Sequence, residues 1–86
     1  MILYGWIGSP LSQVLNKLIL IRQGIIQIEG LDNQTTLTHL WLNENGIAEI
    51  QGFDNCVMLK ELFLNCNKIT RITGLEKMVS LEVLYL

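Results

Sequence analysis

The sequence predicts a solenoid of the α/β type, in which short parallel strands lie side by side along one wall of a coil. Three observations predict it: a repeat of 22 residues, an alternation of apolar and polar residues within each repeat, and a glycine at the same place in each repeat. We expect a right-handed coil with the sheet on its concave side and 3-10 or irregular turns on its convex side. The array is expected to be incomplete.

The repeat emerges when the chain is aligned with itself at a shift of 22 residues, without gaps. Three full units span residues 15–36, 37–58 and 59–80, and a partial fourth unit spans 81–86. Composition alone does not produce six invariant columns, so the units are expected to share one conformation. The columns are Leu15, Leu37 and Leu59; Leu18, Leu40 and Leu62; Leu20, Leu42 and Leu64; Ile25, Ile47 and Ile69; Ile28, Ile50 and Ile72; and Gly30, Gly52 and Gly74.

Each unit begins with a short strand, because leucines at its fourth and sixth positions alternate with outward residues. In the second unit, Leu40 and Leu42 are expected to face inward, while His39, Trp41 and Asn43 face outward. The two isoleucine columns and one further apolar column are expected to fill the interior from the opposite wall. That further column contains Leu31, Phe53 and Leu75.

Asparagine follows the strand in two units, as Asn45 and Asn67, and Gln23 takes this place in the first unit. A buried side-chain amide here can bond the N–H and C=O groups that a turn leaves unpaired. We therefore predict a structural role for the two asparagines and an irregular first turn at Gln23. The glycine column is predicted to need a positive φ or a close backbone approach.

With these features the sequence resembles the leucine-rich repeat family. The family core L-x-x-L-x-L-x-x-N-x-I stands here as LTHLWLNENGI and LKELFLNCNKI, with LNKLILIRQGI as a weaker copy. The repeat length and the I-x-x-I-x-G-L tail are similar to an intracellular subclass that includes the nuclear regulatory subunit of a protein phosphatase and axonemal and ciliary proteins. The resemblance implies an asparagine ladder and a non-enzymatic scaffold for protein binding.

Both ends of the chain depart from the repeat. Residues 1–14 match the apolar and glycine columns only in part, so we expect a degenerate half-unit or cap there. At Leu86 the chain stops within a unit, which leaves the last strand and its core leucines without a polar capping unit. We therefore expect these residues to belong to a longer repeat protein or to be covered by a partner.

The outward strand residues are the candidate partner contacts. Their central column contains Ile19, Trp41, Phe63 and Tyr85. Exposed aromatic residues are enriched at protein interfaces, where Trp and Tyr are frequent hot spots, so we expect this column to bind a protein on the concave face. Alternatively, the rings only stabilise the sheet by cross-strand stacking. The chain would then be a structural segment of a larger multidomain protein, for example a ciliary or phosphatase-regulatory one.

Polar residues flank this column and are expected to surround the bound partner. They are His39, Glu61, Asn43 and Asn65. His39 and Glu61 occupy the same column in successive units, so they are expected to pair or to contact the partner. We identify no nucleophile or third orienting group in register with His39, so no catalytic residue and no enzyme activity are expected.

Charge, motifs and cysteines exclude other classes of function. The net charge is −2 with no basic run, so nucleic acid is not an expected partner. The chain contains no apolar stretch of about eighteen residues and no phosphate-loop spacing, so no membrane, small-molecule or cofactor binding is expected. Cys56 and Cys66 offer neither metal-ligand spacing nor a disulfide framework. Cys56 is predicted to be a core residue, and the protein to be intracellular: cytoplasmic, nuclear or ciliary.

Overall fold

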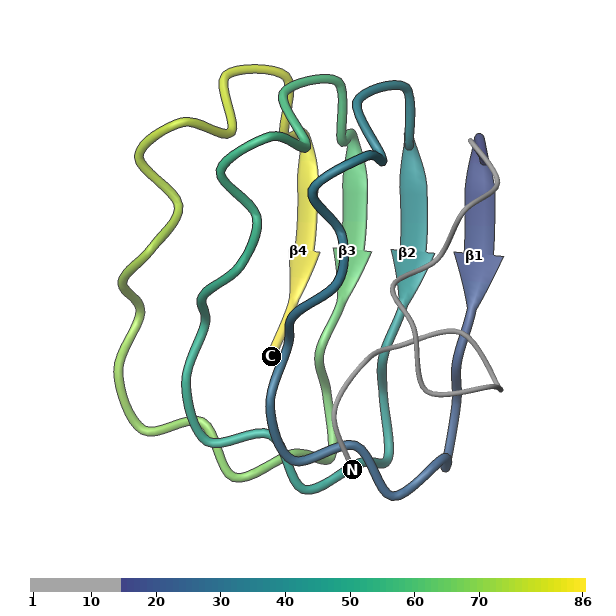
Figure 1. Cartoon of the computed structure of the whole chain (residues 1–86). Coiled ribbons are helices and arrows are strands. Elements are labelled where there is room, and N and C mark those ends of the chain that lie inside the picture. Colours follow the sequence, from purple (N-terminus) through teal and green to yellow (C-terminus); the bar gives the residue numbers. More distant parts are fainter. Residues whose placement is uncertain (1–14) are drawn as a thin grey trace.

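A computed structural model of the chain describes residues 15–86 as successive coils, each contributing one strand to a single sheet. The strands run parallel in the order β1-β2-β3-β4 (Figure 1). They span Lys17–Ile19 (β1), His39–Trp41 (β2), Glu61–Phe63 (β3) and Val83–Tyr85 (β4). The predicted half-unit at 1–14 lies outside the described residues.

The sheet register reproduces the 22-residue shift of the sequence. Leu18 lies opposite Leu40, Leu40 opposite Leu62, and Leu62 opposite Leu84. The ladder continues one residue beyond the strands, since the N–H of Leu20 donates to the carbonyl of Trp41 at 2.8 Å. The N–H and C=O groups of each strand therefore form their hydrogen bonds with the neighbouring coil. For this reason a single unit is not a stable structure.

The predicted inward residues form the core. Leu40, Leu42 and Ile47 are fully buried, as is Phe53 from the opposite wall. Burying each aliphatic side chain contributes about 1.5 to 3 kcal/mol, and one continuous cluster of such residues runs through the middle of the coil.

Several residues of the predicted core are not fully buried: Leu15, Leu18, Ile69, Leu75, Leu81 and Leu84 are partly buried, and Ile72 and Leu86 are exposed. Ile72 belongs to the column of Ile28 and Ile50, which are 1% and 3% exposed, yet Ile72 itself is 64% exposed. In this column, the side chains of Ile28 and Ile50 are each followed by a further described coil. No described coil lies beyond Ile72, so the sequence-based assignment was wrong at this position for lack of a covering neighbour.

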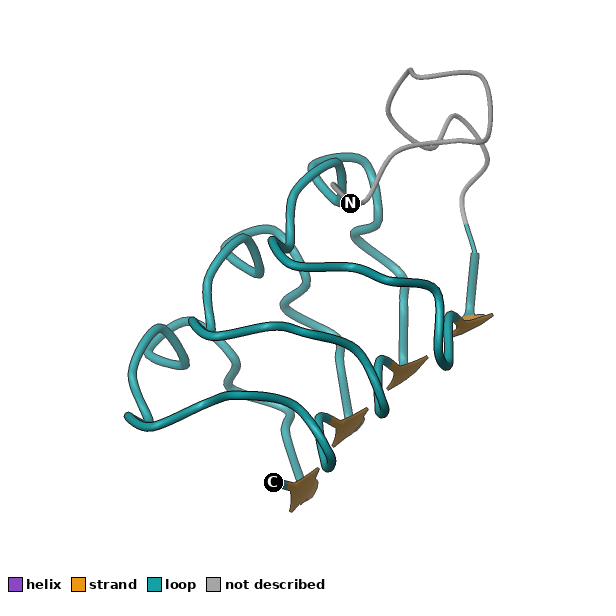
Figure 2. Ribbon diagram, turned by 90° about the horizontal axis from the view of Figure 1, so that it is seen from below, coloured by secondary structure: helices purple, strands orange, loops and turns teal. Residues whose placement is uncertain are grey.

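Residues 15–86 contain turns and no helix on the wall opposite the sheet, so the α part of the predicted fold class is not found there (Figure 2). The turns are closed by bonds between residues three apart, such as Cys56 N–H to Phe53 O at 2.9 Å and Met78 N–H to Leu75 O at 3.1 Å. β-branched isoleucines and a glycine with positive φ disfavour a helix in this segment.

The repeated glycine is required both by its dihedral angle and by its surroundings. Gly52 has a φ of 82° and Gly74 a φ of 74°. A Cβ atom on Gly52 would lie 2.5 Å from the carbonyl oxygen of Ile28, and a Cβ atom on Gly74 would overlap the carbonyl of Ile50. Both predicted reasons for this glycine column are confirmed.

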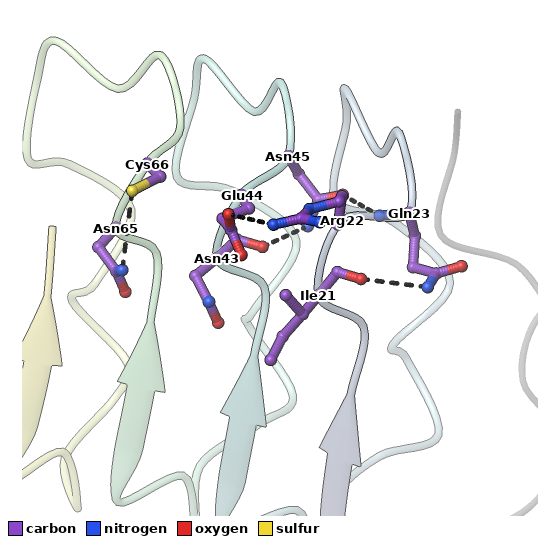
Figure 3. Close-up of polar contacts among 8 residues, drawn as sticks. All are labelled: Ile21, Arg22, Gln23, Asn43, Glu44, Asn45, Asn65 and Cys66. Carbon is purple, nitrogen blue, oxygen red and sulfur yellow. Dashed lines mark hydrogen bonds and ion pairs between the residues drawn. The ribbon is translucent and has the colours of Figure 1, made fainter.

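The asparagine ladder is also present. The Oδ1 of Asn45 accepts from the N–H group of Gln23 at 2.9 Å (Figure 3). It also accepts from the N–H group of Ile25 at 3.1 Å. Its Nδ2 donates to the carbonyls of Leu20 at 2.9 Å and Leu42 at 2.8 Å. Asn45 thereby joins the second coil to three backbone groups of the first coil, and it also bonds the Leu42 carbonyl of its own coil.

Asn67 repeats this arrangement one coil further on, accepting from Ile47 N–H at 3.0 Å and donating to the carbonyls of Leu42 and Leu64 at 2.9 Å. Gln23 does not. Its side chain is exposed, and its Nε2 donates to the carbonyl of Ile21 within its own turn at 3.1 Å (Figure 3). The Gln23 side chain therefore departs from the ladder, but the predicted irregular first turn is not found, because Arg22 has a positive φ like its equivalents Glu44 and Cys66.

Candidate partner-binding face

The outer face of the sheet carries a continuous row of large apolar side chains, here called the aromatic row. It consists of the last residue of each strand: Ile19, Trp41, Phe63 and Tyr85. The register places each member directly beside the next. Ile19 and Tyr85 are 63% and 53% exposed, and the two central members are half-buried. The structure thus brings the predicted contacts together on one surface.

The three rings of the aromatic row stack on one another. Their centroids are 5.1 Å apart between Trp41 and Phe63 and 4.9 Å apart between Phe63 and Tyr85, with interplanar angles of 3° and 11°. These separations match the distance of about 4.8 Å between neighbouring strands, so the sheet itself sets the stack. Cross-strand aromatic pairs of this kind contribute about 0.2 to 1 kcal/mol each.

His39 extends the stack on one side and pairs with Glu61, as expected from the sequence. Its ring lies 5.8 Å from that of Trp41, and its Nε2 is 3.1 Å from a carboxylate oxygen of Glu61. The two side chains are partly accessible, at 23% and 36%. An accessible pair of this kind adds little stability, about 1 kcal/mol at most, and leaves both groups available to a partner.

Thr38 completes this cluster and was not identified from the sequence. Its hydroxyl donates to the carbonyl of Asn16 at 3.0 Å and lies 2.9 Å from the Nδ1 of His39. The single hydroxyl proton is directed at the carbonyl of Asn16 and not at the ring nitrogen. A hydroxyl nucleophile activated by a base would instead donate its proton to the ring. The only sequence signal is its position next to His39.

On the other side of the row, half-buried Asn43 and Asn65 lie where the chain leaves β2 and β3 (Figure 3). The Oδ1 of Asn43 is buried without a hydrogen-bond partner among the described residues, and Asn65 Nδ2 contacts the sulfur of Cys66 at 4.0 Å. The Asn43 acceptor is therefore a polar group that the described part of the chain leaves unsatisfied.

Beyond these asparagines, Arg22 and Glu44 form an exposed ion pair with a 2.8 Å separation between Nη2 and Oε1 (Figure 3). The hydrogen bond to Glu44 and its charge raise the pKa of Arg22 further above its ordinary value. Both residues adopt a positive φ, as does Cys66 in the next coil. The same turn is thus formed after β1, β2 and β3. Its equivalent position holds the charged residues Arg22 and Glu44 in the first two coils and the thiol of Cys66 in the third.

The two cysteines occupy different environments. Cys56 is fully buried, as predicted, and Cys66 is exposed, and both are free thiols. Burial raises the pKa of Cys56 from 9.0 to about 11, with a smaller contribution from the charge of Asp32. Within residues 15–86, no three His, Cys, Asp or Glu side chains are grouped so that they would hold a metal ion.

The raised pKa of Cys56 predicts a loss of stability at alkaline pH. The folded state favours the thiol, so the contribution of Cys56 to the free energy of unfolding is fully present below pH 9.0 and is lost as the pH rises towards about 11. The expected fall is about 2 to 3 kcal/mol. Urea unfolding at several pH values measures it, and Cys56→Val is the control because it keeps an apolar core residue without a thiol. An equal fall in the variant would contradict the assignment.

Comparison with known proteins places this fold in a family. A family model described as leucine-rich repeats, in two copies, matches residues 35–77, which is half of the chain. The chain therefore belongs to the leucine-rich repeat family. Repeats of this family generally mediate protein–protein interactions and are typically non-enzymatic. No curated protein and no solved structure matches the chain. The described part of the chain has no helix of the length and hydropathy that a membrane crossing requires.

Proposed function

We propose that this chain binds a partner protein through the outer face of its sheet, the face predicted to be concave. Trp41, Phe63 and Tyr85 are the main contacts, and Ile19 extends them at the end of the row. One observation supports this more than any other: four large apolar side chains form an accessible, uninterrupted row across all four strands. Contiguous apolar patches with a polar rim are typical of protein-binding surfaces.

The stacking defines what the partner would meet. Neighbouring rings cover one another's faces, so Trp41 and Phe63 present chiefly their edges to the partner. Ring edges carry positive partial charge and favour aromatic faces and sulfur atoms. His39 and Glu61 on one side, and Asn43 and Asn65 on the other, would form the polar surround. The unsatisfied Oδ1 of Asn43 is suited to a backbone or side-chain N–H donor if its amide rotates outward.

A structural role is the second candidate, and the stack itself favours it. Rings packed against each other at 4.9 and 5.1 Å already gain contact area without a partner. On this alternative the chain is a segment of a larger, ciliary or phosphatase-regulatory protein in which another region binds. The two candidates differ in one respect, because only the first requires the aromatic row for binding.

An intracellular location, in the cytoplasm, nucleus or cilium, is part of the proposal. It is supported by the free thiols of Cys56 and Cys66, which a reducing compartment preserves.

The test compares two isoleucines that are equally exposed, at 63%, but lie on different walls of the coil: Ile19 in the aromatic row and Ile26 away from the sheet. Ile19→Ser, and separately the double variant Trp41→Ala with Phe63→Ala, are expected to weaken partner capture from extracts of the cells that express the chain. For the double variant we expect at least about a tenfold loss, because interface hot spots contribute about 2 kcal/mol or more. Ile26→Ser is expected to leave capture unchanged.

Far-ultraviolet circular dichroism of every variant controls for loss of fold. A double variant that keeps its spectrum and still captures the same proteins as the parent chain would refute the proposal and favour the structural role. Equal losses in Ile19→Ser and Ile26→Ser would also count against a binding role for this face.

A further inference from the structure

The ladder asparagine of the second coil is followed directly by a glycine. In an Asn-Gly sequence the backbone nitrogen of glycine can attack the side-chain amide carbon, because no Cβ hinders its approach. We infer that Asn45-Gly46 is a latent deamidation site that the folded coil keeps unreactive. The modification would be a spontaneous hydrolysis that needs water alone as co-reactant.

The reaction balances without any further reagent. The Gly46 nitrogen forms a bond to Cγ of Asn45 while the bond from Cγ to Nδ2 breaks. The proton from the backbone nitrogen leaves with Nδ2 as ammonia, and a five-membered succinimide remains. Water then opens the ring at either carbonyl, which gives aspartate or its β-linked isomer at position 45.

Both reacting groups are held away from this reaction in the fold. The nucleophilic nitrogen of Gly46 donates its proton to the carbonyl of Ile25 at 2.8 Å. The Asn45 amide is bound through both of its ends, with Oδ1 accepting from Ile25 N–H at 3.1 Å and Nδ2 donating to Leu20 O and Leu42 O. Cyclisation requires all of these bonds to open together, so it proceeds only from locally or globally unfolded chains.

The product cannot re-form the ladder. An aspartate at position 45 has no N–H donor, so its carboxylate would face the carbonyls of Leu20 and Leu42 that now accept from Nδ2. A partly buried carboxylate against two acceptors is unfavourable, and the β-linked isomer also adds a backbone atom to the turn. Deamidation at Asn45 therefore turns a reversible unfolding event into a permanent one.

The chain contains its own controls. Asn67 makes the same type of ladder contacts but is followed by Lys68, whose side chain hinders the attack. Gly46→Ala introduces the same hindrance at Asn45. The fold tolerates this change, because Gly46 does not have a positive φ and its added Cβ would meet only Ile26 Cγ2 at 3.4 Å and Ile25 O at 3.8 Å.

The experiment incubates the chain in mildly alkaline buffer, with and without urea, and follows deamidation by peptide mass spectrometry. In urea we expect acid to accumulate at Asn45 about tenfold or more faster than in the folded chain, and well ahead of Asn67. Gly46→Ala should abolish that difference between the two asparagines. After removal of urea, the fraction of chain that refolds should fall in step with conversion at Asn45.

Two results would overturn the inference. The first is equally fast deamidation at Asn45 in the folded chain, which would show that the ladder does not protect it. The second is full refolding of the converted chain, or native stability of Asn45→Asp, which would show that the product is compatible with the coil.

Discussion

Replacing Asn45 with alanine is expected to lower the free energy of unfolding by about 3 to 5 kcal/mol, because a buried group left without its partner costs about 1 to 3 kcal/mol. The change removes a partner of five backbone groups, those of Gln23, Ile25, Leu20, Leu42 and Asn43. The bond to Gln23 is exposed, so water can replace the amide there, whereas the bonds to Ile25 and Leu42 are partly buried. The cost is therefore not the full sum. For a chain of 86 residues with a stability of about 4 to 13 kcal/mol, this is a large fraction.

Urea unfolding followed by circular dichroism measures this loss. Asn33→Ala is the matched control, since Asn33 is exposed in a turn on another wall of the coil. A change within about 0.5 kcal/mol is expected there. Equal stability of the two variants would mean that the ladder contacts do not hold the first two coils together.

Replacing Gly52 with alanine is the second change with a large expected effect, a loss of about 2 to 5 kcal/mol. The residue would have to keep a φ of 82°, which is unfavourable for any L side chain. Its Cβ would also lie 2.5 Å from the carbonyl oxygen of Ile28, and that oxygen belongs to backbone that cannot move aside alone. Thermal or urea unfolding of the purified variant measures the combined cost.

Two other glycines separate the contributions. Gly24 has a φ of 70° with nothing within 4 Å of the added Cβ, so Gly24→Ala should lose only the conformational part, about 1 to 2 kcal/mol. Gly46→Ala has neither problem and should be neutral or stabilising by up to about 1 kcal/mol. The expected order of destabilisation is Gly52, Gly24, Gly46. A Gly52 variant no weaker than the Gly24 variant would contradict the close approach of the coils.

Much of the fold was predictable because the same pattern occurs three times. The alternation of apolar and polar residues predicted that Leu40 and Leu42 both face inward. The turn that follows leaves backbone groups unpaired, which predicted that the side chain of Asn45 bonds them. Ile72 shows the limit of this reasoning, since a column predicts burial only where a neighbouring coil exists.

Single departures from the pattern were harder to predict. Gln34 stands in a column held elsewhere by Cys56 and Met78, and it is fully buried, with its Oε1 accepting from Leu15 N–H at 3.0 Å. The type of residue alone would have placed a glutamine at the surface. Its amide oxygen bonds a backbone donor 19 residues away. A contact between residues so far apart cannot be predicted from a local sequence pattern.

For the candidate site, the sequence predicted which residues share a face but not how their side chains are arranged. The aromatic row follows directly from the period of the strands. The parallel stacking of Trp41, Phe63 and Tyr85, and the contacts of His39 with Thr38 and Glu61, depend on side-chain torsions that a residue pattern does not encode.

The claim that the aromatic row binds a partner is tested most directly by photo-crosslinking. A photoreactive amino acid is placed at position 19 or at position 26, two sites with the same 63% exposure on different walls of the coil, in cells that express the chain. We predict covalent adducts with a discrete partner protein from position 19 and none from position 26. Adducts of equal yield from both positions, or from position 26 alone, would contradict the account.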